Sequence, residues 1–226
     1  MSFDPAVGLD AGAREKLEIV LALLAEERAS VSSVVDERAW RVHVLDSLTG
    51  LEVAPLREAG RIADIGAGAG FPGLVLAVAL PEARVELIES VGRKCEFMRR
   101  AAEQAGIANA TVVNARSEDW AAGEGREAYD AVSARAVGRL STLAELASPL
   151  LRPEGVLVAW KGRRDPEEEA QLANAAAALA MEPEKVLEVG DRAGSEHRHL
   201  YVVHKAGPTP ENLPRKPGIA KKRPKG

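Results

Sequence analysis

The sequence predicts an α/β fold in which helices cover both faces of a doubly wound, mostly parallel seven-stranded sheet. Short apolar runs alternate with segments of helical period between residues 61 and 180, and parallel strands require such helical crossovers. A glycine-rich turn, DIGAGAGFPG at 64–73, follows the first apolar run directly. The last two runs have no helix between them, so we expect an antiparallel hairpin at one edge of the sheet.

Two helices are expected ahead of the sheet. Apolar residues recur at helical spacing across residues 10–29, with charged residues between them. Asp36 is a suitable N-cap for a second helix that ends near Leu48. We therefore assign residues 1–55 to an N-terminal helical extension.

The main domain is expected over residues 56–206 and a basic, proline-rich tail over 207–226, and with the extension they form one structural domain. Its strands are apolar runs bounded by glycine, proline or polar residues, and Pro72 suits the first turn of the first crossover helix. The predicted strands span residues 61–66, 84–88, 111–114, 129–134, 155–160, 184–189 and 198–204. The predicted crossover helices span residues 72–80, 92–105, 139–151 and 166–180.

The composition is that of a globular protein. Hydrophobic residues make up 46% of the 226 residues and charged residues 28%, which is ordinary for such a domain. The single cysteine, Cys95, rules out an intrachain disulfide and a cysteine-rich metal site. The N-terminal MSFDPAVGLDAG lacks the features of a signal peptide, and the longest apolar run, at 74–80, is too short to span a bilayer. We therefore expect a cytoplasmic protein with no membrane partner and no obligate protein partner.

Basic residues are concentrated at the C-terminal end. The chain has a net charge of −4, yet the segment from Lys205 to Gly226 contains seven basic residues and one acidic residue. An acidic body with a basic end is expected when a small region contacts a polyanion. A merely solubilising tail would have the same composition, so charge alone does not decide between the two.

The glycine-rich turn indicates a cofactor that approaches the backbone closely. Glycines in such a turn adopt positive φ and leave room for a ligand. Gly68, Gly70 and Gly73 match the G-x-G-x-x-G pattern of dinucleotide sites. Glu89 lies 21 positions after Gly68, near the position of a ribose-binding acid.

Asp64 favours S-adenosylmethionine over a dinucleotide. It lies at the end of the first strand, two residues before Gly66, where a carboxylate would repel a pyrophosphate. S-adenosylmethionine has no phosphate, and an acid attracts its sulfonium and α-ammonium groups. An alternative stays open here, in which Asp64 accepts hydrogen bonds from the amides of the turn.

Side chains after the next strands complete the expected cofactor site, because ligands of parallel sheets bind at the carboxyl ends of the strands. Glu89 ends the second strand, where its carboxylate can accept from both ribose hydroxyls. Ser117 and Glu118 follow the third strand, beside the expected adenine. Arg135 follows the fourth strand, which faces the methyl group to be transferred.

The acceptor is indicated mainly by what the chain lacks after the fourth strand. VSARAV at 132–137 contains no Asn/Asp-Pro-Pro-aromatic motif, which enzymes that methylate base amino groups usually have. Cys95 follows the second strand, in the wrong place for the nucleophile of pyrimidine C5 methylation. Guanine N7 has an exposed lone pair and needs placement but no base. An amine or another heteroatom is also compatible with the sequence.

Several segments together resemble a known family. They are HVLDSL at 43–48, DIGAGAGFPG at 64–73, LIES followed by Arg93-Lys94, NARSED, SARAV, WKG at 160–162 and RKPGIAKKRP at 215–224. Their order and composition resemble the bacterial small-subunit rRNA guanine-N7 methyltransferases, also called the glucose-inhibited division protein B family, over residues of roughly 40–224.

The resemblance implies a class I, Rossmann-like methyltransferase that uses S-adenosylmethionine to modify N7 of guanine 527 in 16S rRNA, within the 30S subunit. It implies that Gly66, Phe71, Ser117-Glu118 and Arg135 line the cofactor site, with Arg135 in a positioning role near the reaction centre. The expected cofactor-binding residues are therefore Asp64, Gly66, Gly68, Gly70, Phe71, Glu89, Ser117, Glu118 and Arg135.

Two places depart from the family pattern. The segment ERASVSSVV at 27–35 replaces the usual Asn-Leu-Thr, and Ala220 stands where the family usually has proline. These departures leave open the details of the N-terminal helices and the path of the tail.

Basic residues at two places are the expected RNA contacts. Lys161 and Arg163 follow the fifth strand, at the edge of the sheet where ligands bind, although a solvated charged loop has the same pattern. Lys221, Lys222 and Arg223 lie in the proline-rich tail, where we expect them to bind phosphates as the tail becomes ordered on RNA.

Histidines suggest two further sites, and both are disfavoured. His43, Asp46 and Ser47 would share a helix, but the nucleophile of a hydrolase triad normally lies on a strained turn. His197 and His199 alternate on a strand, but two ligands do not make a zinc site, so no metal is expected. Two alternatives to an rRNA methyltransferase stay open: an S-adenosylmethionine-dependent methyltransferase with a small-molecule or protein acceptor, and a dinucleotide-binding oxidoreductase or binding module.

Overall fold

The structure of the protein is a computed structural model that describes residues 9–27, 32, 34–36, 38–190 and 197–225. The strands are β1 (Arg61–Ile65), β2 (Arg84–Glu89), β3 (Ala110–Asn114), β4 (Tyr129–Arg135), β5 (Leu151–Lys161), β6 (Met181–Glu188) and β7 (His199–Lys205). The α-helices are α1 (Ala11–Glu26), α2 (Asp46–Leu48), α3 (Ala54–Arg57), α4 (Gly73–Ala79), α5 (Gly92–Gln104), α6 (Ser117–Ala121), α7 (Leu140–Ala147), α8 (Pro166–Ala176) and α9 (Ile219–Lys222). A π-helical turn (Trp40–Leu45) precedes α2, and 3-10 turns span Thr49–Glu52 and Ala177–Leu179.

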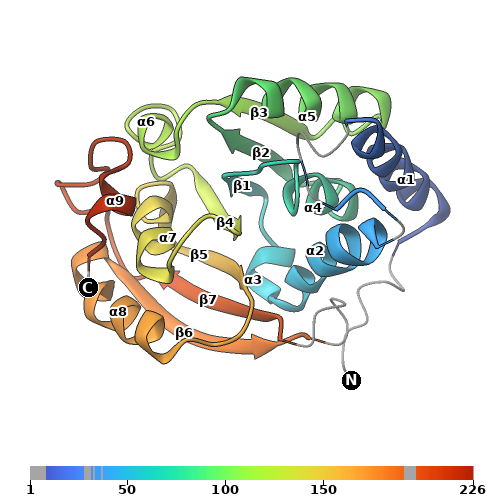
Figure 1. The fold of residues 1–226 in the computed structure, drawn as a ribbon. Coiled ribbons are helices and arrows are strands. Elements are labelled where there is room, and N and C mark those ends of the chain that lie inside the picture. The colour runs from blue at the N-terminus through green and yellow to red at the C-terminus, as the bar shows by residue number, and fades with distance from the viewer. Residues whose placement is uncertain (1–8, 28–31, 33, 37, 191–196, 226) are drawn as a thin grey trace.

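The strands form one seven-stranded sheet in the order β3-β2-β1-β4-β5-β7-β6 (Figure 1). Strands β1 to β5 pair in parallel, whereas β7 pairs antiparallel with β5 and with β6. The predicted parallel sheet and its antiparallel edge hairpin are therefore confirmed. The strand order reverses between β1 and β4, and open α/β sheets bind their ligands at such a point.

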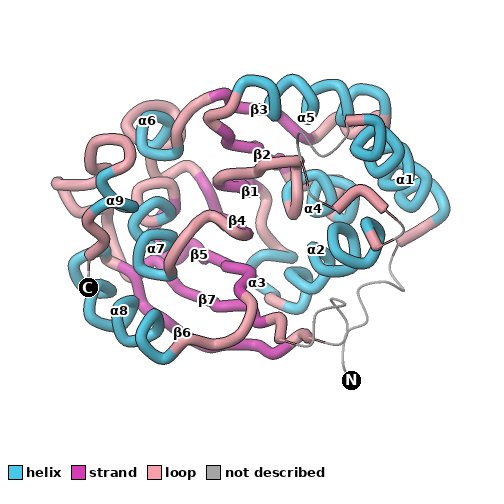
Figure 2. The backbone as a smooth tube through the Cα atoms, in the orientation of Figure 1, coloured by secondary structure: helices cyan, strands magenta, loops and turns pink. Residues whose placement is uncertain are grey.

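Helices cover both faces of the sheet, each over its own apolar core (Figure 2). On one face, α1, α4 and α5 pack with Ile62 of β1. On the other face, α7 and α8 pack with Ala63 and Ile65 of the same strand. The residues of β1 fall into different cores because successive side chains of a strand point to opposite faces of the sheet.

The N-terminal extension packs onto the first of these cores. Leu17, Val20 and Leu24 of α1 are fully buried, which matches the predicted amphipathic pattern. The predicted helix 10–29 ends at Glu26, and positions 28 and 29 lie outside the described residues, as do parts of the divergent segment 27–35. Asp36 does not begin a helix itself: it accepts the backbone N–H and the guanidinium of Arg38 at 3.0 and 2.8 Å, just before the π-helical turn.

Several other elements differ from the predictions. Strand β5 begins at Leu151, because Leu151 pairs with Tyr129 before a shift of register, and α7 ends correspondingly early at Ala147. Glu154 has a φ of 69°, which marks an irregularity in the first part of β5. Helices α6 and α9 were not predicted. No helix in the described part of the chain has the length and apolar character needed to cross a bilayer.

The C-terminal tail is folded onto the main domain, which corrects the prediction that it becomes ordered on RNA. Helix α9 lies beside α7 (Figure 1), and Leu213 and Ala220 are each 2% exposed. Arg215 donates two hydrogen bonds of 2.5 Å to the buried carboxylate of Glu145 on α7. A tail with buried apolar residues and a buried ion-pair partner has an ordered path of its own.

Candidate functional site

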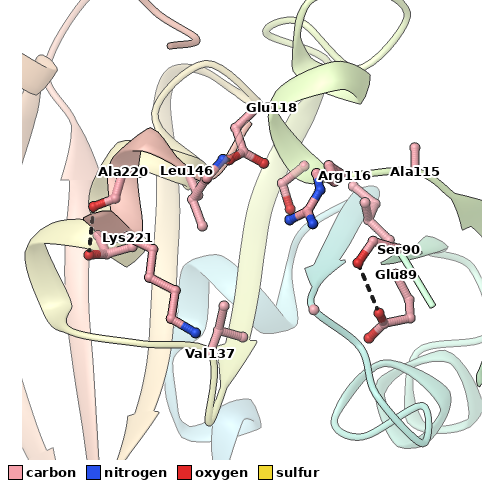
Figure 3. Close-up of a pocket in the computed structure, with 14 residues that line it drawn as sticks. Glu89, Ser90, Ala115, Arg116, Glu118, Val137, Leu146, Ala220 and Lys221 are labelled. Atoms are coloured by element: carbon pink, nitrogen blue, oxygen red, sulfur yellow. Dashed lines mark hydrogen bonds between the residues drawn. The ribbon is translucent and has the colours of Figure 1, made fainter. Parts of the chain in front are cut away.

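A pocket lies at the carboxyl edge of the sheet, where β1, β2, β3 and β4 end (Figure 3). Loops after these four strands supply one side of it, and α7 together with the C-terminal tail supplies the other. The lining residues are Gly66, Ile88, Glu89, Ser90, Ala115, Arg116, Ser117, Glu118, Val137, Thr142, Leu146, Gly218, Ala220 and Lys221. Four predicted cofactor-binding residues are among them: Gly66, Glu89, Ser117 and Glu118.

Gly66 forms the floor of the pocket because no larger residue fits there. Its φ is +63°, a conformation that favours glycine. A Cβ atom at Gly66 would lie 2.7 Å from Cγ2 of Val137, which also lines the pocket. The glycine therefore lets the ends of β1 and β4 approach each other and leaves the backbone open to a ligand.

The amides of the glycine-rich turn are hydrogen-bonded within the protein. Gly66 and Ala67 donate to the carbonyl of Ile88 at 2.8 and 3.2 Å. Gly68 donates to Oε2 of Glu89 at 3.0 Å. A dinucleotide site requires free N–H groups for the pyrophosphate, so this turn disfavours the dinucleotide alternative on grounds that the sequence pattern did not show.

Glu89 joins the turn to the pocket. Its Oε1 accepts the backbone N–H of Val91 at 2.9 Å, and its Oε2 accepts that of Gly68. The carboxylate is 7% exposed. Oε1 also accepts the hydroxyl of Ser90, in a long bond of 3.5 Å. Each carboxylate oxygen has two lone pairs, so Oε2 retains one for a diol such as ribose, and a second ribose hydroxyl could replace the long bond from Ser90 at Oε1.

Asp64 lies beneath the turn and is not among the residues that line the pocket. It is fully buried, with Oδ2 accepting the backbone N–H of Gly73 and Oδ1 accepting the hydroxyl of Ser133, both at 2.9 Å. Burial raises the pKa of Asp64 to about 7, and these two hydrogen bonds oppose that rise. The geometry thus matches the alternative in which Asp64 holds an amide of the turn. Gly68, Gly70 and Phe71 also lie outside the pocket lining.

Ser117 and Glu118 form the start of α6, after β3, as the sequence placed them. Oε1 of Glu118 accepts the backbone N–H of Gly218 in the C-terminal tail at 2.7 Å. Leu146, Ile88 and Ala115 give the pocket an apolar wall beside these polar groups. An apolar wall next to carboxylates suits a nucleoside.

Arg135 faces the N-terminal helices and does not line the pocket. Its guanidinium donates to Oδ2 of Asp46 at 2.8 Å and to the carbonyl of Val42 at 3.0 Å, and it lies 3.2 Å from Nδ1 of His43. Arg198 binds Oδ1 of the same carboxylate at 2.7 Å. The end of β4 is thereby joined to α2 by a buried carboxylate shared between two arginines.

The hydrolase hypothesis is wrong. Ser47 is fully buried, and its hydroxyl donates to the backbone carbonyl of His43 at 2.5 Å, with no bond to the imidazole. The His43 ring stacks on Phe71 at a centroid distance of 4.5 Å. Burial lowers the pKa of His43, which keeps the stacked imidazole neutral. These contacts build a packing interface between the N-terminal helices and the glycine-rich turn.

Two of the other three histidines, His197 and His199, lie near the predicted basic loop. Nε2 of His197 is 2.9 Å from the guanidinium of Arg163, and Nδ1 of His199 is 2.9 Å from the carbonyl of Gly162. Lys161 is bound to Glu168 and to the carbonyl of Gly138, at 2.8 and 3.0 Å. Of the two predicted RNA contacts in this loop, Arg163 is exposed, whereas Lys161 is already paired.

The tail brings a predicted RNA contact to this pocket. Lys221 lines the pocket and reaches across it to the side of Val137 (Figure 3). Lys222 and Arg223 are exposed and do not line it.

Sequence reasoning missed Thr142 and Leu146 of α7, and it placed Arg116, Val137, Gly218 and Ala220 only within motifs, without a role in the pocket. Their contribution depends on contacts between distant segments, for which the chain carries no local pattern.

The fold and the pocket define a class I, Rossmann-like methyltransferase. The chain belongs to the rRNA small subunit methyltransferase G family, whose family model matches residues 15–201. This confirms the resemblance that the motifs indicated.

Proteins of the same name are similar over most of their length. The ribosomal RNA small subunit methyltransferase G of Rubrobacter xylanophilus is 44% identical over 216 residues, which cover 92% of this chain and 81% of that protein. That of Pelotomaculum thermopropionicum is 38% identical, covering 86% of this chain and 82% of that protein.

Solved structures support the fold. A predicted O-methyltransferase from Agrobacterium tumefaciens is 28% identical, with a TM-score of 0.55 over 73% of this chain and 80% of that chain. A SAM-dependent methyltransferase from Aquifex aeolicus has a TM-score of 0.57 at 17% identity, over 90% of this chain and all of that chain.

Proposed function

We propose that this protein transfers the methyl group of S-adenosylmethionine to N7 of guanine 527 in 16S rRNA, in the numbering used for the family's RNA. We place the reaction in the cytoplasm, on the 30S subunit. The observation that carries the proposal is the pocket at the switch point of the sheet, where Gly66, Glu89 and Glu118 lie around an apolar wall. Membership of the methyltransferase G family supports the acceptor.

The pocket residues fit S-adenosylmethionine. Gly66 leaves a cradle that a Cβ atom would close, and Glu89 can accept the ribose hydroxyls through the remaining lone pair of Oε2 and by replacing the long bond from Ser90 at Oε1. Ser117 and Glu118 would hold the adenine together with the apolar wall. The donor supplies an electrophilic methyl group on its sulfonium. The satisfied amides of the glycine-rich turn speak against a pyrophosphate in its place.

The protein contributes placement of the acceptor more than acid–base chemistry. Guanine N7 attacks with its own lone pair, so no general base is required. We propose Arg135 as a positioning residue, because it fixes the N-terminal helices against the end of β4 through Asp46. Holding two structural elements in register beside a reacting centre lowers the entropic cost of placing a substrate.

The RNA is proposed to contact exposed cations at the same edge. Arg163, Lys222 and Arg223 are exposed, and phosphate contacts of this kind orient a nucleic acid without reading its sequence. Lys161 would join them only by exchanging its ion pair with Glu168. These cations favour an RNA acceptor over a small molecule or a protein.

The test is methyl transfer from labelled S-adenosylmethionine to 30S subunits that lack the modification, followed by nucleoside mass spectrometry. We expect 7-methylguanosine, located at position 527 by mapping of the labelled RNA fragment. Naked 16S rRNA in a parallel reaction distinguishes the free RNA from the assembled subunit as the substrate.

A glycine pair supplies the matched control. Gly66→Asp fills the pocket floor, whereas Gly106→Asp imposes the same positive-φ strain, at +62° compared with +63°, in open space away from the pocket. We expect Gly66→Asp to abolish donor binding and methyl transfer and Gly106→Asp to retain both. Donor binding by the wild-type protein without 7-methylguanosine would overturn the proposed acceptor.

A further inference from the structure

The C-terminal tail forms one wall of the proposed donor pocket. Gly218, Ala220 and Lys221 line it opposite Glu89 and Ser90, which come from the end of β2 (Figure 3). The match to the family model ends at residue 201, and this wall lies C-terminal to it, within the segment 215–224 that resembles the terminal motif of the family.

Four contacts hold the wall in place. Arg215 is paired with the buried Glu145, as described above, and also donates to the carbonyl of Arg223 at 2.8 Å, which closes the tail around α9. Gly218 donates to Glu118, and Thr142 donates to the carbonyl of Ala220 at 3.3 Å. The backbone that carries Lys221 is therefore anchored on both α6 and α7.

Lys221 brings a positive charge into the pocket. Its side chain extends from α9 to the side of Val137 (Figure 3), and Val137 is the residue that a Cβ atom at Gly66 would meet. Within the described residues, its ammonium has no hydrogen bond or ion pair to the protein, although Glu89 and Glu118 line the same pocket. A charged group held on a pocket wall without a protein partner is available to a ligand.

We propose that Lys221 is a donor-binding residue that pairs with the α-carboxylate of S-adenosylmethionine. This inference rests on the proposed function. Among the charged groups of the donor, the sulfonium and the α-ammonium are positive, so the carboxylate is the group that a lysine attracts. Lys221 lies at the end of the pocket formed by Gly66 and Val137, away from the Ser117 and Glu118 end proposed for adenine.

This assignment separates Lys221 from its neighbours in the basic tail. All three cations of this segment, Lys221, Lys222 and Arg223, are exposed, but only Lys221 lines the pocket, so Lys222 and Arg223 are left for RNA phosphates. In this assignment Lys221 binds the donor, and the remaining cations of the tail bind the RNA. The tail thus contacts both substrates, through residues that are adjacent in sequence.

The experiment compares two ligands by isothermal titration calorimetry. S-adenosylmethionine and its decarboxylated analogue differ only in the carboxylate, so the ratio of their dissociation constants reports the contacts of that group. We expect Lys221→Met to weaken binding of S-adenosylmethionine about tenfold, as for a charge-assisted hydrogen bond, and to leave binding of the decarboxylated analogue nearly unchanged. The preference of the wild-type protein for the carboxylate is then largely lost.

Lys222→Met is the matched control, because it removes the same charge from the adjacent position of α9 outside the pocket lining. It should keep the wild-type preference and instead reduce the affinity for RNA. Arg116→Met tests the other cation of the pocket. The inference is overturned if Lys221→Met retains the preference, or if Arg116→Met alone removes it. Failure of the wild-type protein to bind either ligand would overturn the proposed function itself.

Discussion

Gly218 and Glu118 are 100 residues apart in the chain, and the backbone N–H of Gly218 donates a 2.7 Å hydrogen bond to the Glu118 carboxylate. The bond joins the tail to the first turn of α6, at the edge of the pocket. Glu118, which the sequence places near the expected adenine, therefore also holds the tail that forms the opposite wall of the pocket.

Glu118→Ala should loosen the tail more than it weakens the fold. A neutral or charge-assisted hydrogen bond at a partly exposed site contributes about 1 kcal/mol, so global unfolding should change little. The local effect is measured by limited trypsin digestion at Lys221 and Lys222. We expect faster cleavage there than in the wild-type protein, and cleavage at the wild-type rate would show that the other contacts hold the tail alone.

Arg215→Met should destabilise the whole protein. The substitution leaves the carboxylate of Glu145, 3% exposed, without its guanidinium. Removing one partner of a buried pair costs about 3–5 kcal/mol, and the partial exposure of Arg215 reduces this to about 2 kcal/mol in urea-induced unfolding. The double variant Arg215→Met/Glu145→Leu should recover most of the loss, because it removes the uncompensated charge as well.

Asp46→Ala should uncouple the N-terminal helices from the end of β4. Its carboxylate is 1% exposed and neutralises both Arg135 and Arg198. Its loss leaves two facing cations and should cost about 3 kcal/mol or more in urea-induced unfolding. We also expect methyl transfer to fall while donor affinity stays close to that of the wild type, since Asp46 does not line the pocket. If methyl transfer and donor affinity fell equally, the cluster of Asp46, Arg135 and Arg198 would contribute to donor binding.

Asp64 should make stability depend on pH between about 4 and 7. Its folded-state pKa of about 7 lies above the ordinary value of 3.8, so the folded state holds the proton more tightly and is favoured at low pH. That stabilisation is fully present below about pH 4 and is lost as pH rises through 7.

Asp64→Asn isolates this effect, because the amide can still accept from Gly73 and donate to Ser133 without titrating. The free energy of unfolding of the variant minus that of the wild type should increase from pH 4 to pH 7. A difference independent of pH over this range would show that Asp64 titrates at an ordinary pKa in the folded protein.

The sequence by itself determined the sheet and the part of the pocket that strands carry. The alternation of apolar runs and helical segments predicted β1 to β7 in order, and parallel strands must end at one edge. Gly66, Glu89 and Ser117-Glu118 were therefore expected together, and the structure places them around one pocket. Each prediction depended on residues within a few positions of a strand end.

Only the tertiary structure decided which distant segments meet there. The path of the tail depends on Arg215 reaching Glu145 across 70 residues, and the orientation of Arg135 on Asp46 across 89. No local sequence pattern indicates either ion pair, because ion pairs between distant segments depend on how whole elements pack. Lys221 was thus expected at an RNA phosphate, yet it lines the pocket at the carboxyl edge of the sheet, since a basic residue has the same character in sequence wherever its side chain comes to lie.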